Sequence, residues 1–533
     1  MRTEARAVDF PNPIKLIVTH RAALRHKHGP KVRRVYRALQ DLKRADRRRG
    51  LIDHVVLLDG SPVLRRLGIR AVRDPTDERA VKEAIEALCR KLKPHFVVLL
   101  GGPDVIPHQS LSNPLAQSGH DPVIPSDLPY ACEGPHSDNP NAFTHPTRLV
   151  GRLAGLTGVV DPASLVSALR YAARWRPRSR RDYERPFMVS ALEMEKSTRA
   201  TLKSVFGHDR GLHVVPPRTG PVKSQWKWPE GQMQRRAHYL NCHGIKGEDE
   251  LTGTAVGRTR MEPLAHHSPY AGPRIREGTV AVVEACYGAE LYDPRNAETS
   301  EGDFAGSDQP MAIAYLRHGA YAYFGSTTTS WGADIGAAHA DIICQRFMAH
   351  IIAGRSSGRA ALEARIDYLK LNPEDRPFDP QQLLTVSQFV LLGDPSIHPV
   401  VPPGLECRER GPVPHAVRAT FAQQAHQPPS VRSPGRQRQV VREVANPRVE
   451  GSIHRHLHTL AQRRGGKPAS LKTYSLEPRP APPGSRRTSG GSRSMHVLHA
   501  VRPPNARGQT RRIMVVAESD GRKVLSSQVL HSK

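Results

Sequence analysis

Two residues of the chain have the chemistry of a catalytic pair, a cysteine thiol and a histidine imidazole. Each comes directly after a short apolar segment: residues 237–242 lead into His243, and residues 279–285 lead into Cys286. A thiolate can attack a carbonyl carbon, and an imidazole can protonate the amine that leaves. The two residues together therefore predict a hydrolase that uses a cysteine and a histidine.

Glycines lie close behind both candidates. Gly244 directly follows His243, and Gly288 lies two residues after Cys286. A glycine lets the backbone of a substrate approach closely, and it leaves a backbone N–H free to point at a developing oxyanion. Both positions are therefore suited to a site where a carbonyl carbon is attacked.

The elements that must position this pair alternate between strands and helices. We predict strands over 14–19, 54–58, 96–100, 236–242, 279–285 and 320–324, and helices over 31–49, 77–93, 161–175, 334–353 and 358–371. This order is typical of a parallel sheet with helices on both faces. In such sheets ligands bind beyond the carboxyl ends of the strands, which is where both candidates fall.

The composition excludes several classes of protein. The chain has 533 residues and a net charge of +29, with no apolar run long enough to span a membrane and no signal-peptide pattern in the first thirty residues. Its six cysteines form no CxxC pair, which excludes a disulfide scaffold and a zinc ribbon. We therefore expect a cytoplasmic protein with free thiols.

Much of the positive charge lies in the last quarter of the chain. Residues 403–533 contain 24 Lys and Arg against seven Asp and Glu. Clusters of Pro, Ser, Gly and Arg predict a disordered linker over 403–490, which is either a solvated tail or an arm for nucleic acid. Aromatic residues for base stacking are scarce there, which favours the tail. Three strand-like segments within 491–533 predict a small β meander.

Four further motifs accompany the histidine and the cysteine. They are Val97-Val98-Leu99-Leu100-Gly101-Gly102-Pro103-Asp104-Val105-Ile106-Pro107, Ser126-Asp127-Leu128-Pro129-Tyr130-Ala131, Val150-Gly151-Arg152-Leu153 and Leu391-Leu392-Gly393-Asp394-Pro395-Ser396. Together with the His-Gly and Ala-Cys pair, they make residues 14–400 resemble the gingipain-type cysteine peptidases of the caspase-like clan.

This resemblance implies a fold and an activity. The fold is a caspase-like three-layer α/β fold with two similar parallel-sheet subdomains, here residues 1–160 and a catalytic subdomain over 161–402. The activity is that of a cysteine endopeptidase. Cys286 is then the nucleophile, His243 is the general acid, and the backbone N–H groups of Gly244 and Cys286 form the oxyanion hole.

The resemblance also implies residues that bind the substrate. Asp161 is the candidate for recognising a basic P1 side chain, although its position before Pro162 favours a role as the N-cap of a helix. Ser330 and Trp331 resemble a segment that lines the same pocket, although Trp331 could equally be a buried aromatic residue. Calcium occurs in the family, and the acidic run Glu248-Asp249-Glu250 is its candidate site here; no other cofactor is implied.

Two other functions remain open at this point. The chain could be an inactive peptidase-like scaffold that binds nucleic acid through its basic tail, or a caspase-like regulatory peptidase of another family that cleaves one partner protein. The intact His243 and Cys286 argue against the first alternative. The Leu391–Pro395 stretch favours the gingipain type over the second. The expected partner is therefore a protein or peptide substrate.

Overall fold

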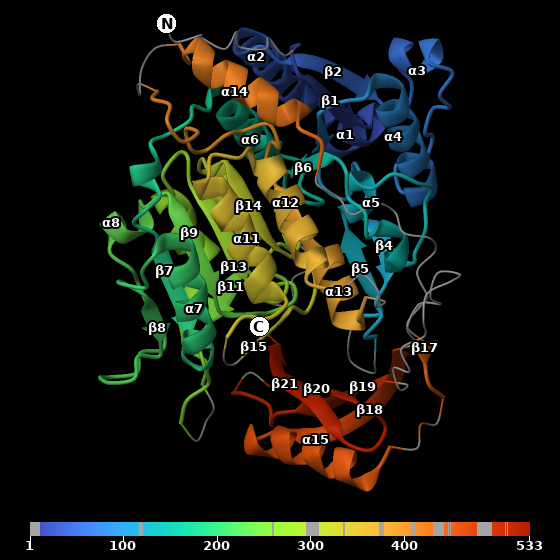
Figure 1. Cartoon of the computed structure of the whole chain (residues 1–533). Helices are drawn as coiled ribbons and strands as arrows, with labels where there is room; N and C mark the ends of the chain where they lie inside the picture. The colour runs from blue at the N-terminus through green and yellow to red at the C-terminus, as the bar shows by residue number, and fades with distance from the viewer. Residues whose placement is uncertain are drawn as a thin grey trace, which may run out of the picture.

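The computed structural model describes most of the chain (Figure 1). It covers residues 11–532 apart from 117–120, 258–260, 295–308, 334–335, 373–377, 408–411, 430–441, 446, 448, 477–492, 507 and 509.

A ten-stranded sheet forms the centre of the molecule. Its strands, in spatial order, are β2 (Ile52–Leu57), β1 (Ile14–Thr19), β3 (Phe96–Leu100), β6 (Leu149–Leu153), β16 (Phe389–Leu392), β14 (Ala322–Ser326), β13 (Val280–Glu284), β9 (Ala237–Asn241), β7 (Phe187–Ala191) and β8 (His213–Val215). All neighbours pair in parallel except β16, which is antiparallel to β14. β16 also pairs with β6, so the strands of the two predicted subdomains form one continuous sheet.

Helices form a layer on each face of this sheet. They are α1 (Arg21–His28), α2 (Val32–Arg49), α3 (Pro62–Arg66), α4 (Glu78–Leu92), α5 (Leu128–Ala131), α6 (Ala163–Arg174), α7 (Glu195–Phe206), α8 (Glu230–Met233), α9 (Ser268–Ala271), α10 (Met311–Arg317), α11 (Ala340–Ile352), α12 (Ser357–Lys370) and α13 (Pro380–Gln388). Alternate residues of β13 belong to two apolar clusters, one shared with α2, α6 and α10 and one shared with α7, α11 and α13. The three-layer, caspase-like α/β fold is confirmed.

Short strands and a second sheet complete the structure. The short strands are β4 (Gln109–Ser112), β5 (Val123–Ser126), β10 (His243–Gly244), β11 (Glu250–Thr252) and β12 (Leu264–His267). The second sheet has the order β15 (Trp331–Ala333), β21 (Val524–Ser532), β20 (Arg512–Ser519), β19 (Arg493–Val501), β18 (Lys467–Leu476) and β17 (Arg442–Glu443). The predicted meander is thus present as β19, β20 and β21, and it is part of a larger sheet.

The expectation of a disordered linker over 403–490 does not hold for four segments. α14 (His415–His426), β17, α15 (Gly451–Arg463) and β18 are regular elements within this range. Ile453, Leu457 and Ala461 of α15 lie at helical spacing and pack on the second sheet, which gives this basic segment an apolar face to bury. The predicted linker residues 430–441 and 477–490 lie outside the described residues.

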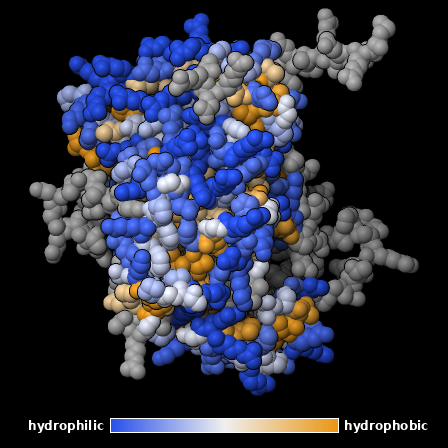
Figure 2. All heavy atoms as spheres, turned by 90° about the vertical axis from the view of Figure 1, so that its left-hand side faces the viewer, coloured by the Kyte–Doolittle hydropathy of each residue, from blue (hydrophilic) through white to orange (hydrophobic). Residues whose placement is uncertain are grey.

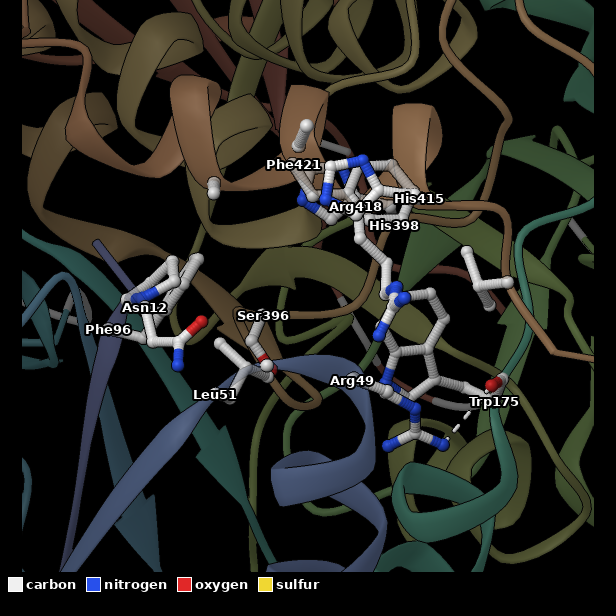
Figure 3. Close-up of a pocket in the computed structure, with 15 residues that line it drawn as sticks. Asn12, Arg49, Leu51, Phe96, Trp175, Ser396, His398, His415, Arg418 and Phe421 are labelled. Carbon is white, nitrogen blue, oxygen red and sulfur yellow. Dashed lines mark hydrogen bonds between the residues drawn. The ribbon is translucent and has the colours of Figure 1, made fainter. Parts of the chain in front are cut away.

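α14 packs against the central α/β body. Phe421 stacks on His398 with ring centroids 3.7 Å apart and lies 6.1 Å from Trp175. Between α14 and this body lies a cavity of about 150 Å³, into which Arg49 and Arg418 also face (Figure 3). This helix is therefore a packed part of the body rather than a tail.

The outer surface beside α7, α8 and β8 is largely hydrophilic, with small apolar areas between charged residues (Figure 2). Among the described residues, no helix is long and apolar enough to cross a membrane.

A buried arginine connects three of the sequence motifs. Arg152 donates from Nε to Asp127 at 2.9 Å and from Nη1 to the carbonyl oxygen of Ile106 at 2.6 Å. The side chain of Arg152 is fully buried, and the two-point contact with a carboxylate satisfies its charge. The Gly-Arg-Leu, Ser-Asp and Ile-Pro stretches are thus held together by one side chain, and their role is structural.

The fourth motif is held by a buried lysine. Lys15 on β1 donates to Asp394 at 2.8 Å and also pairs with Asp46, and all three side chains are fully buried. Burial alone would lower the pKa of the Lys15 ammonium, but the charges of Asp394 and Asp46 outweigh it and hold this pKa above its usual value. The Gly-Asp-Pro segment is therefore anchored to β1 by this ion pair.

This contact predicts a stability effect. Asp394→Ala leaves the Lys15 charge in the core with one partner instead of two, so we expect the free energy of unfolding to fall by about 3 kcal/mol. Asp41→Ala, which removes an exposed ion pair with Arg44, is the control and should cost less than about 0.5 kcal/mol. Chemical denaturation measures both; equal losses in the two variants would contradict the prediction.

Candidate active site

Two parallel strands bring Cys286 and His243 to the same edge of the central sheet. β13 and β9 are neighbours, and their register pairs Glu284 with Asn241. Cys286 and His243 each lie two residues beyond this pair. Strand pairing therefore brings together the two residues that the sequence predicts as catalytic, at the carboxyl ends of their strands.

Gly244 lies directly against the backbone of Cys286. A Cβ atom at Gly244 would be 1.8 Å from the carbonyl oxygen of Cys286, a separation that no side chain can adopt. Only glycine allows the two segments to approach this closely. The two residues predicted to supply the oxyanion hole are thus in backbone contact.

The Cys286 thiol sits in a sharp turn directly after β13. Tyr287, the next residue, has a left-handed backbone with φ of 54°, and its N–H donates to the carbonyl oxygen of Thr328 at 3.0 Å. The N–H of Ser330 donates to the Cys286 sulfur at 3.3 Å, and the thiol donates to the Ser330 carbonyl oxygen at 3.6 Å. The backbone of Ser330 thus holds the sulfur in place at the carboxyl end of β13.

Glu193 holds the imidazole of His243. Its Oε1 atom lies 2.5 Å from Nε2 of His243, whose side chain is buried. Because a carboxylate only accepts hydrogen bonds, Nε2 carries the hydrogen and Nδ1 is the basic nitrogen. Among the described residues, Nδ1 has no hydrogen-bond partner. It is the atom available to exchange a proton with the nucleophile or the substrate.

Burial and charge set the protonation of this pair. Burial lowers the pKa of His243, the charge of Arg511 lowers it further, and the hydrogen bond to Glu193 only partly offsets both. Burial would raise the pKa of Glu193, but the hydrogen bond from His243 and the charges of His243 and Arg502 hold it well below its usual value. At neutral pH the pair is a carboxylate and a neutral imidazole.

Glu193 is not among the residues that the sequence predicts as catalytic. It lies two residues after β7, the strand that pairs with β9 on the side away from β13. Its own N–H donates to Oγ1 of Thr254 at 2.9 Å, which fixes its backbone. Polar residues that follow neighbouring parallel strands come together at one edge of the sheet, and this rule could have identified Glu193. An acidic residue after an apolar segment is, however, too common in the sequence for the rule to select this one.

The predicted substrate-binding residues fall in two places. Ser330 contacts Cys286, and Trp331 directly follows it at the start of β15 with a buried ring. Asp161 is half-exposed and pairs with Arg34 on α2 at 3.2 Å. It does not cap α6, whose cap position is Pro162. No contact between described residues joins Asp161 to the catalytic pair, and its role in P1 recognition stays a prediction.

The acidic run predicted to bind calcium is engaged by protein groups. Asp249 accepts from the hydroxyl of Ser268 at 2.7 Å, and its carbonyl oxygen accepts from the Ser268 N–H at 3.1 Å. Within the described ranges, no group of three or more His, Cys, Asp or Glu side chains is arranged to hold a metal ion. Calcium binding by Glu248–Glu250 stays a prediction from the resemblance, and no step below uses it.

Comparison with known protein families bears on this site. Residues 270–400 match the model of peptidase family C25, the gingipain family. The matched segment contains Cys286, Ser330 and Trp331 and ends before β17, so β15 is the one strand of the second sheet that lies inside it. No curated protein matches the chain. The predicted resemblance to gingipain-type cysteine peptidases, which are hydrolases of proteins, is confirmed.

The backbone contact at Gly244 predicts the effect of one added methyl group. Gly244→Ala should push the Cys286 turn away from β10 and lower the free energy of unfolding by about 2 kcal/mol. Gly231→Ala is the control, because a Cβ there meets no atom within 4 Å. Thermal melts of both variants test this, and a Gly244→Ala protein as stable as Gly231→Ala would refute the close approach.

Proposed function

We propose that the chain is a cysteine endopeptidase that cleaves peptide bonds with Cys286 as nucleophile and His243 as the proton-transfer group. One observation supports the proposal most: β13 and β9 pair in register, one is followed by Cys286, whose backbone lies against Gly244, and the other is followed by His243, whose Nε2 is held by Glu193. The match to peptidase family C25 supports the reaction class.

In the first step, His243 Nδ1 accepts the thiol proton and the Cys286 sulfur attacks the carbonyl carbon of the scissile bond. The negative charge that forms on the carbonyl oxygen is stabilised by the backbone N–H groups of Gly244 and Cys286. His243 then gives its proton to the leaving nitrogen, the C–N bond breaks, and a thioester remains on Cys286.

In the second step, a water molecule loses a proton to the neutral His243 and attacks the thioester carbonyl carbon. The C–S bond breaks, the carboxylic acid product leaves, and the proton returns to the Cys286 sulfur. Throughout, Glu193 keeps Nδ1 as the reacting nitrogen and stabilises the imidazolium that forms in each half-reaction. Glu193 is therefore a positioning residue rather than a group that touches the substrate.

Preference for a basic P1 residue is a finer part of the proposal. The prediction from the sequence rests on Asp161, whose carboxylate pairs with Arg34 in the structure. Cleavage of a peptide library with all side chains at P1 tests the preference directly. The comparisons give no support for the predicted nucleic-acid contact through residues 403–490.

Separate replacement of Cys286 and of the nearby Cys242 tests which sulfur is the nucleophile. Cys286→Ala should reduce peptide hydrolysis at least about 1,000-fold, because no other thiol replaces the attacking sulfur. Cys242→Ala is the matched control: Cys242 is buried in the apolar core beside His243, and the variant should keep most of the activity. Equal loss of activity in two folded variants would contradict the assignment of Cys286.

The role of Glu193 is tested by a pH profile. Glu193→Gln keeps the size of the side chain but removes the charge that raises the pKa of His243 and stabilises the imidazolium. We expect kcat to fall by about 10- to 1,000-fold and the acid limb of kcat/KM to move to lower pH.

Glu195→Gln is the control for this variant. Glu195 is a neighbouring acidic residue that pairs with Arg199 and Arg218, away from His243. It should change neither kcat nor the pH profile. An unchanged acid limb in Glu193→Gln would show that Glu193 does not act through the imidazole.

A further inference from the structure

The C-terminal part of the chain packs directly on residues 161–402, which we call the catalytic half. We call residues 451–532, with α15 and strands β18 to β21, the C-terminal module. One face of its sheet is covered by α15. Leu530, Met514 and Val497 on the other face share one apolar core with Trp331 and Phe324 of the catalytic half. Figure 1 shows the module below the catalytic half, beside β15.

The last strand of the module, β21, lies beside β15, the short strand that begins directly after Ser330. β21 pairs antiparallel with β15, with Ser532 opposite Trp331 and Leu530 opposite Ala333. β21 therefore runs toward Ser330, whose N–H donates to the Cys286 sulfur at 3.3 Å. An extended peptide that reaches Cys286 along this edge would add to β15 as a strand. β21 already occupies that position.

Two arginines of the module, at the ends of the loop between β19 and β20, pair with carboxylates near His243. Arg502 donates to Oε2 of Glu193 at 2.5 Å, while Oε1 of the same carboxylate holds His243. Arg511 donates to Glu262 at 3.1 Å and to Oγ1 of Thr252 at 3.2 Å, and Thr252 pairs with His243 between β11 and β10.

A backbone hydrogen bond joins the two ends of the loop at which these arginines lie. The N–H of Arg502 donates to the carbonyl oxygen of Arg511 at 2.8 Å, so both side chains leave from one fixed backbone pair. Both side chains are mostly buried, at 18% and 12% exposed, against carboxylates that are 16% and 2% exposed. Ion pairs that are largely removed from water give orientation and specificity to a docked surface.

We propose that the C-terminal module is a built-in inhibitor: β21 fills the peptide-binding edge of β15, Arg502 and Arg511 clamp the module to the carboxylates around His243, and the chain is latent until the module is displaced. The inference rests on the proposed peptidase function. It is regulation of the same site by competition, because β21 and a substrate strand cannot both pair with the same edge of β15. Displacement then requires loss of the two ion pairs as well as of the strand pairing.

The full-length chain with Arg502→Ala and Arg511→Ala tests the clamp. Two readouts are followed: turnover of a test peptide, and the rate at which iodoacetamide alkylates Cys286, mapped by mass spectrometry and divided by the rate at Cys407. We expect both readouts to rise about tenfold or more over the unmodified chain, because removal of two mostly buried ion pairs shifts the population toward the open form.

Two controls accompany this variant. Arg455→Ala with Arg522→Ala removes two arginines of the module, and among the described contacts neither side chain pairs with a carboxylate of the catalytic half. It should leave both readouts at the level of the unmodified chain. Arg502→Lys with Arg511→Lys keeps both charges and should open the site less than the alanine variant.

The outcomes separate the inference from the peptidase proposal. Alkylation and turnover that stay at the level of the unmodified chain in a folded alanine variant overturn the inhibitor. Faster alkylation of Cys286 without turnover in any variant supports the occlusion and overturns the peptidase.

A measurement without substitutions covers the case in which the alanine variant does not fold. Alkylation of the unmodified chain is compared at about 0.05 M and about 1 M NaCl, because salt weakens ion pairs. A higher rate at Cys286 relative to Cys407 in high salt supports the clamp. An unchanged ratio overturns it.

Discussion

The proposed chemistry and the docking of the C-terminal module both depend on the two hydrogen bonds of the Glu193 carboxylate. One oxygen accepts the Nε2 hydrogen of His243, which leaves Nδ1 as the reacting nitrogen of the proposed mechanism, and the other accepts from the guanidinium of Arg502. Burial would raise the pKa of the Glu193 carboxyl, but the hydrogen bond from His243 and the charges of His243 and Arg502 outweigh it and keep the carboxylate charged. The geometry of the histidine and the docking of the C-terminal module therefore share one side chain.

Much of the catalytic framework could be predicted from the sequence, because it depends on short-range patterns. Apolar segments before His243 and Cys286 become β9 and β13, and parallel pairing is enough to bring their ends together. The glycine after His243 has a direct steric reason in the backbone of Cys286. The other motifs were recognised as patterns, and their physical meaning, such as the fork of Arg152 on Asp127, came only from the structure.

What the sequence did not show depends on contacts between distant positions. Glu193 is 309 residues from Arg502, and neither residue stands in a pattern that marks it as functional. Residues 403–490 contain few apolar residues, so their composition favours disorder. The three apolar residues on one face of α15 are nevertheless enough, because β19 and β20 supply the rest of that core. Whether such a segment folds depends on the apolar surface that other parts of the chain offer it, and the composition of the segment alone does not show that surface.

The docked module also changes the chemistry of the site that it covers. Arg511 lowers the pKa of His243, so the closed form holds an imidazole that is a weaker base. When the module leaves, this positive charge leaves with it, while the Glu193 carboxylate remains and still raises that pKa. The imidazole then becomes a stronger base, better able to hold the thiol proton of Cys286. Opening the peptide-binding edge and increasing the basicity of His243 are thus consequences of a single displacement.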